Sequence, residues 1–463
     1  MIGRLLLLGA TGDLAGRFLL PALAGLHAAG QLPDGFRVVG AAQQDGDDAG
    51  FARHVDARLQ AHAADVPAEA RRRLLDGLGY CTVDLEDPAT VAEALRRAGE
   101  GGGSSGTAVA VYLALPPALF PAALRALGAV GLPPGSRVVV EKPFGEDLDS
   151  AVALNALLAG VTDGLGEQAR FRVDHVLGMP TVRDLLGLRA PGAVLEPVWN
   201  SAHVEQVDVL WEETLALEGR ADFFDRAGAV KDVVQNHMLQ LLALVALELP
   251  AGGELGDARL AALRAVRVPT AADAASRTRR ARYTAGQLAG AGGAVPDYGQ
   301  EEGVDPDRGT ETYAELVLEL DLPRWAGTRF VLRAGKGLAA GRKGVQLHFR
   351  GAAGAPSRGL WIGLDGAQGS PASSRADETA LAPRPLVVPP PPQQGERAAY
   401  TAVLRDVLSG SSARSVSGEE SEQAWRIVEP VLQAWAAGAV PLLEYAAGTA
   451  GPGLLPREGA VAG

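Results

Sequence analysis

The sequence has one cysteine, few lysines and no long apolar run, and each scarcity excludes a class of protein. A single cysteine, Cys81, among 463 residues excludes an intrachain disulfide and a CxxC metal site, and it suits a reducing compartment. We expect no metal centre. No stretch approaches the ~20 apolar residues that a membrane helix needs, and the run Leu5–Leu8 is too short for the core of a signal peptide. We therefore expect a soluble, cytoplasmic protein that does not bind membranes.

Basic residues are also fewer than acidic residues. Asp and Glu number 55 against 43 Lys and Arg, and the formal charge of −12 argues against a nucleic-acid-binding protein. Small molecules are the expected partners. Only four of the basic residues are lysines: Lys142, Lys231, Lys336 and Lys343. A lysine kept in a chain that otherwise uses arginine favours a role that the bulkier guanidinium does not fill.

The N-terminal pattern predicts a Rossmann domain. The apolar run Leu5–Leu8 stops at the sequence GATGDLA of residues 9–15, after which leucines recur at helical spacing. This order predicts a strand, a tight turn and a helix. Further strands are expected near residues 36–41, 109–115 and 137–140, with helical patterns between about 48 and 78. Strands that alternate with helices predict an α/β Rossmann dinucleotide-binding domain, which we assign to residues 1–174.

The remainder, residues 175–463, has longer segments in which apolar and polar residues alternate. This pattern predicts an α+β domain with a large, mainly antiparallel sheet. The expected strands are His203–Leu210, Thr312–Leu320, Thr328–Arg333 and Gly344–Phe349, and the expected long helices are Val230–Leu249 and Ser421–Gly438.

Several residues carry candidate chemistry, and each has a plain structural alternative. Gly9 and Gly12 have the spacing that brings a backbone close to a pyrophosphate, although any tight strand-to-helix turn favours glycine. Lys142 follows an expected strand at the carboxyl edge of the sheet, where ligands bind, although most lysines are simply solvated. Helical spacing places His237 on an apolar stripe, so it is either a satisfied core histidine or a buried base. Asp174 is a carboxylate that can pair with an imidazole and make it a base near neutral pH.

Taken together, these motifs resemble the glucose-6-phosphate dehydrogenase family over nearly the whole chain. The matching segments are GATGDLA (9–15), VYLALPP (111–117), EKPFG (141–145), RVDHVLG (172–178), EGRADFFD (218–225), KDVVQNHMLQ (231–240), TETYAEL (310–316), RWAG (324–327), LRAGK (332–336) and AWRIVEP (424–430). The resemblance implies that the second domain binds substrate and forms dimers, so we expect a homodimer or homotetramer.

The resemblance also implies roles for individual residues. His237 would remove the proton of a C1 hydroxyl while hydride passes to NADP or NAD, and Asp174 would orient the imidazole. A sugar-like substrate would be held by Lys142, His175, Glu213, Asp232 and Lys336, of which Glu213 has the poorest flanking match. The implied cofactor site consists of Gly9, Thr11, Gly12, Asp13, Leu14, Gln43, Pro116 and Lys142.

Departures from the family pattern concentrate where phosphate groups bind. In the family's RIDHYLGK motif, Val176 here replaces the tyrosine and Met179 replaces the lysine. Phe18 stands where the family usually has a lysine. Gln43 stands where an arginine normally pairs with the 2′-phosphate of NADP, so the preference between NAD and NADP stays open. Each lost charge-assisted hydrogen bond weakens binding by about 1.5–3 kcal/mol.

Three hypotheses follow. The favoured one is an oxidoreductase that transfers hydride between NAD(P) and a sugar-like ring, with altered or absent phosphate recognition. The runner-up is an authentic glucose-6-phosphate 1-dehydrogenase, which forms the 6-phosphogluconolactone and in which groups such as His175, Lys336 or Arg342 replace the missing contacts. A non-catalytic binding paralogue is the alternative of another class. The direction of hydride transfer stays open.

Overall fold

The computed structural model describes residues 1–100, 106–190, 192–217, 219, 221–249, 254–288, 293–351, 358–364, 386–388 and 395–455. Glu218 and Arg220 of the motif at 218–225 lie outside this set. The chain forms two compact units, residues 1–179 with 394–422 and residues 180–393 with 423–463. The expected single boundary after residue 174 is therefore wrong, because a late segment of the chain packs with the N-terminal unit.

The first unit contains a six-stranded sheet in which every pair of neighbours is parallel. Its strands are β1 (Arg4–Leu8), β2 (Arg37–Ala42), β3 (Leu78–Thr82), β4 (Ala110–Leu113), β5 (Arg137–Glu141) and β6 (Arg170–Val173). The strand order is β3-β2-β1-β4-β5-β6. This is the doubly wound order of a dinucleotide-binding domain, with the switch point between β1 and β4. The expected Rossmann domain is confirmed.

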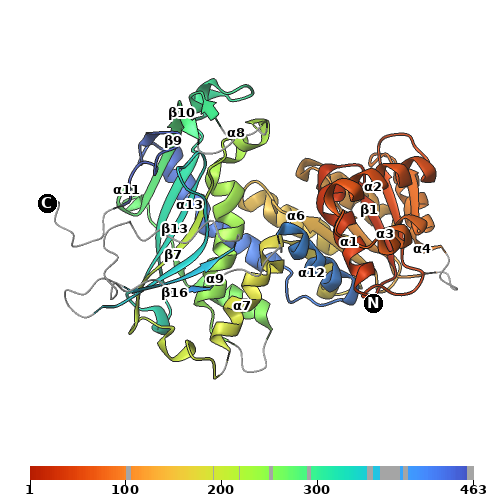
Figure 1. Cartoon of the computed structure of the whole chain (residues 1–463), viewed down its shortest axis with the longest axis horizontal. Coiled ribbons are helices and arrows are strands. Elements are labelled where there is room, and N and C mark those ends of the chain that lie inside the picture. Colours follow the sequence, from red (N-terminus) through yellow and green to blue (C-terminus); the bar gives the residue numbers. More distant parts are fainter. Residues whose placement is uncertain are drawn as a thin grey trace. The chain divides into compact units, whose positions relative to one another are not determined.

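Helices cover this sheet (Figure 1). They are η1 (Ala15–Leu19), α1 (Leu20–Ala28), α2 (Asp48–His62), α3 (Ala68–Asp76), α4 (Pro88–Gly99), α5 (Phe120–Val130) and α6 (Leu148–Val161), with short 3-10 turns η2 (Pro117–Leu119), η3 (Glu167–Ala169) and η4 (His175–Gly178). The helical stretch expected from about 48 to 78 is divided into α2 and α3. Pro67 caps α3 and Gly77 ends it, so the chain turns there and enters β3.

Helix α12 (Glu396–Ser409) comes from late in the sequence but packs beside α1 in the first unit (Figure 1). Its buried side chains, among them Tyr400 and Leu404, belong to the same apolar core as β1 and α1. The backbone N–H of Ile2 donates to the carbonyl of Leu408 over 2.7 Å. The contacts of α12 are the reason that residues 394–422 belong to the first unit.

The second unit is built on a nine-stranded mixed sheet. Its strands are β7 (Val204–Glu212), β8 (Val266–Arg267), β9 (Thr278–Thr284), β12 (Tyr313–Leu320), β13 (Arg329–Gly335), β14 (Arg342–Phe349), β15 (Arg358–Gly363), β16 (Leu386–Val388) and β17 (Leu442–Ala446). The order is β16-β15-β14-β7-β13-β12-β9-β17, with β8 paired to β12. Three pairs, β7–β13, β9–β17 and β15–β16, are parallel and the others antiparallel. The expected large, mainly antiparallel sheet is confirmed.

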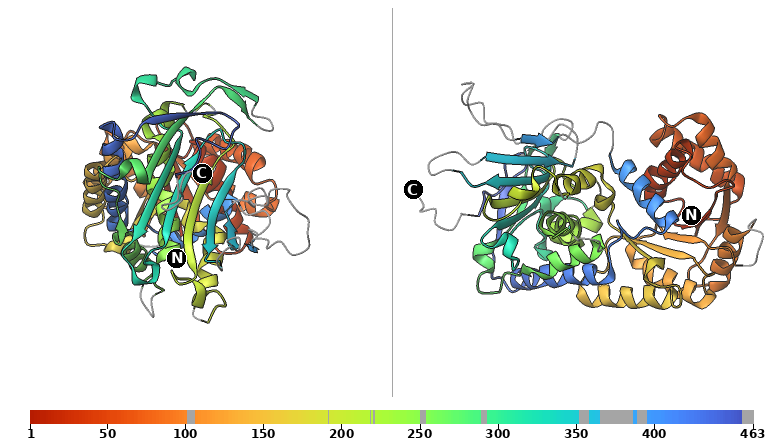
Figure 2. Two further views of the ribbon diagram at one scale, coloured as in Figure 1. Left: turned by 90° about the vertical axis from the view of Figure 1, so that its left-hand side faces the viewer. Right: turned by 90° about the horizontal axis from the view of Figure 1, so that it is seen from below.

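A helical layer lies against one face of this sheet (Figure 2). The helices of the unit are α7 (Pro180–Arg189), α8 (Ala221–Ala229), η6 (Val230–Met238), α9 (Leu239–Ala246), α10 (Leu255–Arg264), α11 (Ala274–Arg277) and most of α13 (Gly418–Ala436), and a hairpin is formed by β10 (Gly286–Leu288) and β11 (Gly293–Val295). The helix expected over Val230–Leu249 is a π-helix, η6, that continues as the α-helix α9 and ends at Ala246. π-Helical turns are rare and occur frequently at functional sites.

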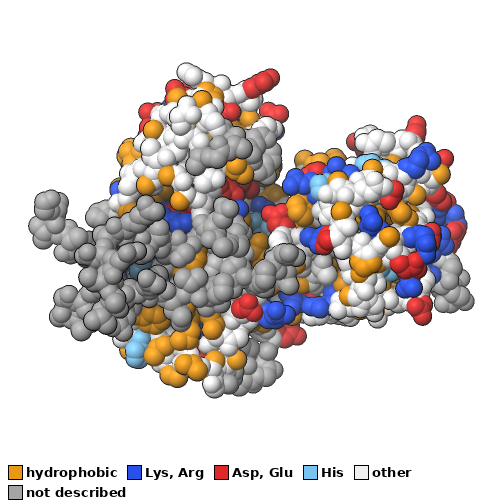
Figure 3. Space-filling model, in the orientation of Figure 1, with side chains coloured by type: hydrophobic (Ala, Val, Ile, Leu, Met, Phe, Trp, Pro, Cys, Tyr) orange, Lys and Arg blue, Asp and Glu red, His pale blue; other side chains and the backbone are white. Residues whose placement is uncertain are grey.

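The surface shown in Figure 3 mixes charges of both signs over the first unit. Exposed ion pairs such as Arg73–Glu69 (3.3 Å) are of the kind that contributes at most about 1 kcal/mol each. Among the described residues, no helix is both long enough and apolar enough to span a bilayer.

Candidate active site

The turn after β1 lies at the switch point of the first unit's sheet. The N–H groups of Gly9 and Ala10 both donate to the carbonyl of Ala41 at the end of β2, over 2.7 and 3.2 Å. Gly9 has a φ of +83°, and a Cβ there would lie 2.3 Å from the carbonyl oxygen of Ala114. The turn therefore has no room for a side chain at this position, and it precedes the first turn of a helix. The N–H groups at the N-terminus of a helix that follows such a turn bind a pyrophosphate, so this turn fits a dinucleotide.

The neighbouring residues of the turn have defined partners. Thr11 donates to the side-chain carbonyl of Gln44 over 2.9 Å, which links the turn to the end of β2. Asp13 accepts from Arg58 on α2 at 2.9 Å and from Arg17 at 3.2 Å. Leu14 is half-buried against the apolar core, so its side chain anchors the turn.

Four cofactor candidates remain in this unit. Gln43 is exposed after β2, and Pro116 is exposed after β4, where its carbonyl accepts from the N–H of Leu119 over 2.9 Å. Lys142 is half-buried directly after β5. Gly12 closes the first turn by donating to the carbonyl of Gly9 over 3.0 Å. All four follow parallel strands at their carboxyl ends, the edge where ligands bind in open α/β sheets.

A buried acid lies beside Lys142. Glu141, at the end of β5, is 6% exposed and accepts a hydrogen bond from the hydroxyl of Tyr112 on β4. Burial raises the pKa of Glu141 to about 8. A role for this carboxyl group was not predicted from the sequence, because an acid at the end of a strand is ordinarily solvated.

Asp174 and His175 stand at the beginning of the 3-10 turn η4. Asp174 is fully buried, and its Oδ1 accepts from the N–H of Val176 over 3.1 Å. The imidazole of His175 stacks on the ring of Tyr400 from α12, with centroids 5.4 Å apart and planes inclined by 20°. At Gly178 the chain passes so close to α12 that a Cβ would lie 2.4 Å from the carbonyl oxygen of Ala399. Helix α12 therefore holds this segment in place.

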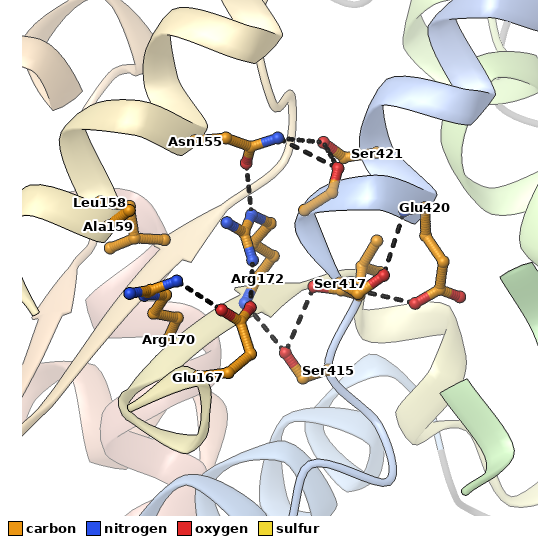
Figure 4. A network of polar contacts seen from close by, with 12 residues as sticks. Asn155, Leu158, Ala159, Glu167, Arg170, Arg172, Ser415, Ser417, Glu420 and Ser421 are labelled. Carbon is orange, nitrogen blue, oxygen red and sulfur yellow. Dashed lines mark hydrogen bonds and ion pairs between the residues drawn. The ribbon is translucent and has the colours of Figure 1, made fainter. Parts of the chain in front are cut away.

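A polar network fixes the strand that leads into Asp174 (Figure 4). Arg172 on β6 is buried, and its Nε donates to Asn155 of α6 over 2.8 Å. Its backbone N–H donates to the hydroxyl of Ser415 over 3.1 Å, and its carbonyl accepts from the N–H of Val416 over 2.9 Å. Burial lowers the pKa of Arg172 to about 10. The segment at 415–416 thus pairs with the edge strand and immobilises it two residues before Asp174.

His237 lies in the π-helix of the second unit. The side chain is 3% exposed, so the predicted inward orientation is confirmed. Its imidazole stacks on the indole of Trp211 from β7, with centroids 5.0 Å apart and planes inclined by 28°. Because π-helical hydrogen bonds join residues five apart, Asp232 and His237 lie on the same side of this helix. An α-helix would have turned these two residues apart.

Glu213 and Lys336 are brought together in the same unit. Lys336 Nζ lies 2.5 Å from one carboxylate oxygen of Glu213, and Lys343 Nζ lies 3.0 Å from the other. Burial alone would raise the pKa of Glu213, but the two ammonium groups outweigh it and lower that pKa to about 2. Lys336 also lies over the ring of Phe224, with Nζ 5.1 Å from the centroid. The cluster carries two positive charges against one negative charge.

Besides Glu141, three contributors to the site were not predicted from the sequence. Trp211 carried no sequence signal, since an aromatic residue in a strand usually serves the core. Lys343 did carry one, because it is among the four lysines of the chain. Tyr400 lies about 220 residues from His175, and no local pattern predicts their contact. Asp174 belongs to the first unit and His237 to the second, and their pairing stays a prediction.

Comparison with known proteins identifies the family. A family model described as "Glucose-6-phosphate dehydrogenase, NAD binding domain" matches residues 6–184. A second, described as "Glucose-6-phosphate dehydrogenase, C-terminal domain", matches residues 186–359 and 391–457. The chain belongs to the glucose-6-phosphate dehydrogenase family. The second match resumes at residue 391 and so includes α12, the helix that packs with the first unit.

Relatives within this family are similar over almost their whole length. The "Glucose-6-phosphate 1-dehydrogenase 2" of Mycobacterium tuberculosis is 35% identical over 97% of this chain and 91% of its own. The "Glucose-6-phosphate 1-dehydrogenase" of Mycolicibacterium smegmatis is 36% identical over 96% of this chain and 93% of its own.

Solved structures of glucose-6-phosphate dehydrogenases are also similar to this chain. One, described as "Glucose-6-phosphate dehydrogenase in complex with its substrate glucose-6-phosphate", has a TM-score of 0.84 and 27% identity over 97% of this chain and 95% of its own. The glucose-6-phosphate 1-dehydrogenase of Mycobacterium avium has a TM-score of 0.77 and 29% identity over 97% and 94%. The protein is thus an NAD(P)-dependent oxidoreductase of the glucose-6-phosphate dehydrogenase type, acting on a CH–OH group of a small sugar substrate.

Proposed function

We propose that the protein is a glucose-6-phosphate 1-dehydrogenase, which oxidises C1 of glucose 6-phosphate to the lactone with NAD or NADP. The observation that carries this proposal is the cluster of Lys336, Lys343 and Glu213, on the same unit as His237. Its excess positive charge suits an anionic substrate better than a neutral sugar. The named activity of the relatives, which match over almost their whole length, supports the same substrate.

In the proposed reaction His237 is the general base. The C1 hydroxyl gives its proton to the imidazole, the C1–H bond breaks as its hydrogen leaves with the electron pair as hydride to NAD(P), and the electron pair of the former O–H bond forms the C1–O double bond of the lactone. Bound NAD(P) supplies the two-electron hydride acceptor. A positioned base contributes about 10²- to 10⁴-fold to such a step. Asp174 orients the imidazole and balances its positive charge after proton transfer.

The remaining candidates hold the substrate and the cofactor. Lys142, at the carboxyl edge of the first unit's sheet, is proposed to contact both. Glu213, Asp232 and Lys336 contact the sugar, and His175 faces its phosphate end. The close turn made by Gly9 and Gly12 brings the following helix N-terminus to the pyrophosphate, which its N–H groups hold.

A second candidate function is supported by one observation in the first unit. Val176 is fully buried and Met179 is 7% exposed, at two positions where the family motif has a tyrosine and a lysine. An apolar wall does not offset the desolvation of a phosphate dianion. An enzyme whose sugar substrate lacks this phosphate, or carries it elsewhere, would keep both His237 and Asp174 and would have these replacements.

The two candidates are separated by steady-state kinetics on glucose 6-phosphate and on glucose, each with NAD and with NADP. The first predicts a kcat/KM for glucose 6-phosphate of about 10⁴ M⁻¹s⁻¹ or more, and a large excess over glucose. A value for glucose that equals or exceeds the one for glucose 6-phosphate contradicts it and supports the second. His237→Asn is expected to lower kcat by about 10²- to 10⁴-fold on the true substrate, with the cofactor dissociation constant unchanged.

A further inference from the structure

We propose that Trp211 is the residue that positions the general base, by holding the imidazole of His237 against its indole ring. The inference rests on the proposed role of His237. Trp211 is 7% exposed and His237 is 3% exposed, and their ring centroids lie 5.0 Å apart with the planes inclined by 28°. Near-parallel rings at this separation are a favourable stacked arrangement.

The sheet explains how the indole reaches the π-helix. Along β7, Val207, Val209 and Trp211 stand at every second position and so share one face of the strand. The η6 helix, which carries His237, packs on the strands β7 and β13. In register with Trp211 are Ala334 on β13 and Lys343 on β14. The small side chain of Ala334 leaves the neighbouring space to the large ring.

Trp211 also connects the imidazole with the charged cluster. Lys343 Nζ lies 4.9 Å from the centroid of the indole and 3.0 Å from a carboxylate oxygen of Glu213. A cation above an indole face is attracted to it by the charge distribution of the ring. The indole is therefore fixed by its own strand and by an ammonium group, and it is a firm support for the imidazole.

A general base needs such a support because its ring turns about two single bonds. Proton transfer requires one ring nitrogen to lie within hydrogen-bond reach of the hydroxyl, about 2.6–3.2 Å, and a misplacement of 1 Å reduces the rate by about 10²-fold. The helix backbone is held at the same place, since the N–H of His237 donates to Asn236 Oδ1 over 2.7 Å. Stacking on the indole restricts the freedom that remains, which is rotation of the imidazole ring out of its plane.

The experiment compares Trp211→Leu and Trp211→Phe with the matched control Trp361→Leu. Trp361 is a buried tryptophan on β15 of the same sheet. We expect Trp211→Leu to lower kcat by about 10- to 100-fold, with the substrate KM within threefold, roughly 0.6 kcal/mol, and the cofactor dissociation constant unchanged. Trp211→Phe keeps a ring to stack on and is expected to recover most of kcat. Trp361→Leu should lower thermal stability without a comparable loss of kcat.

A spectroscopic readout covers the case in which Trp211→Leu does not fold. The contribution of Trp211 to the fluorescence, taken as wild type minus Trp211→Phe, should differ from the same contribution taken in a His237→Asn background, which removes the stacked imidazole. The inference is overturned if the two contributions are equal, if Trp211→Leu retains the wild-type kcat, or if Trp211→Phe is as deficient as Trp211→Leu. Full activity in His237→Asn would instead overturn the proposed function, so the two failures are distinguishable.

Discussion

Glu311 is a buried acid at the start of the helix that carries His237, and its ionisation can be tested through the pH dependence of stability. Its carboxylate is 7% exposed, and Oε1 accepts from the N–H of Val230, the first residue of the π-helix, over 3.0 Å. Its backbone carbonyl accepts from the N–H of Ala229 over 3.2 Å. Gly228 approaches so closely, with a φ of +64°, that a Cβ would lie 2.5 Å from Oε1. The acid therefore closes the N-terminus of the helix that carries His237.

The cost of ionising this group follows from its pKa. Burial raises the pKa of Glu311 from 4.5 to about 7, against the opposing effect of the Val230 N–H and of the charges on Arg280 and Lys231. Between these two values the native state holds a proton that the unfolded state has lost, so the free energy of unfolding falls as the pH rises. An interval of about 2.5 pH units at ~1.36 kcal/mol per unit amounts to about 3 kcal/mol, nearly all of it lost by pH 8.

The perturbation is Glu311→Gln, which keeps an oxygen for the Val230 N–H but does not titrate. Urea unfolding would be followed by tryptophan fluorescence, because all six tryptophans lie in residues of the second unit, which also contains Glu311. Relative to wild type, the variant should gain about 2–3 kcal/mol between pH 5 and pH 8. The exposed Glu302→Gln in the same unit is the control and should show no such gain. A difference between Glu311→Gln and wild type that stays constant with pH would refute the reasoning.

Three other expectations concern the first unit. Because Gln43 is neutral and exposed, we expect the ratio of kcat/KM for NADP over NAD to stay below about a thousandfold, or ~4 kcal/mol, in steady-state assays of both cofactors. Gly9→Ala should lower Tm and abolish stabilisation by NADP in a thermal-shift assay, whereas Gly30→Ala, whose φ of +63° is also positive but which has no atom within 4 Å of a Cβ, should lower Tm less and keep that stabilisation. Arg172→Met should destabilise the protein by about 1–3 kcal/mol, because it leaves the side-chain oxygen of Asn155 without its donor, while the exposed Arg96→Met should change Tm little; equal shifts would contradict the structural role of Arg172.

The fold was largely predictable because hydrophobic periodicity is a local signal. The runs that form β1, β5 and β13 are apolar or alternating over their whole length, and each was expected within two residues of its observed bounds. The π-helical form of η6 was not predictable, because a segment of nine residues is too short for its apolar pattern to distinguish a π-helix from an α-helix. The position of α12 was not predictable either, since its amphipathic pattern does not say which unit it covers.

The site was predictable where motifs are contiguous and not where contacts are distant in sequence. Gly9 and His237 were found from their immediate neighbours in the chain. Trp211 reaches His237 only because β7 and η6 pack together, and Tyr400 reaches His175 only because α12 returns to the first unit. Pairings of this kind depend on tertiary packing, which no short-range pattern records.

The departures at Phe18 and Val176 acquire a common explanation from α12. Phe18, at the position of a family lysine, stacks on Tyr400 with ring centroids 5.4 Å apart, and Tyr400 stacks in turn on His175 at the same separation. The charge of a lysine is thus exchanged for a three-ring stack that joins η1, α12 and η4. Val176 is fully buried in the same turn as His175, so a larger tyrosine there would have to displace packed neighbours. These replacements fit one another, and they leave His175 as a rigidly held imidazole in the motif that binds phosphate elsewhere in the family.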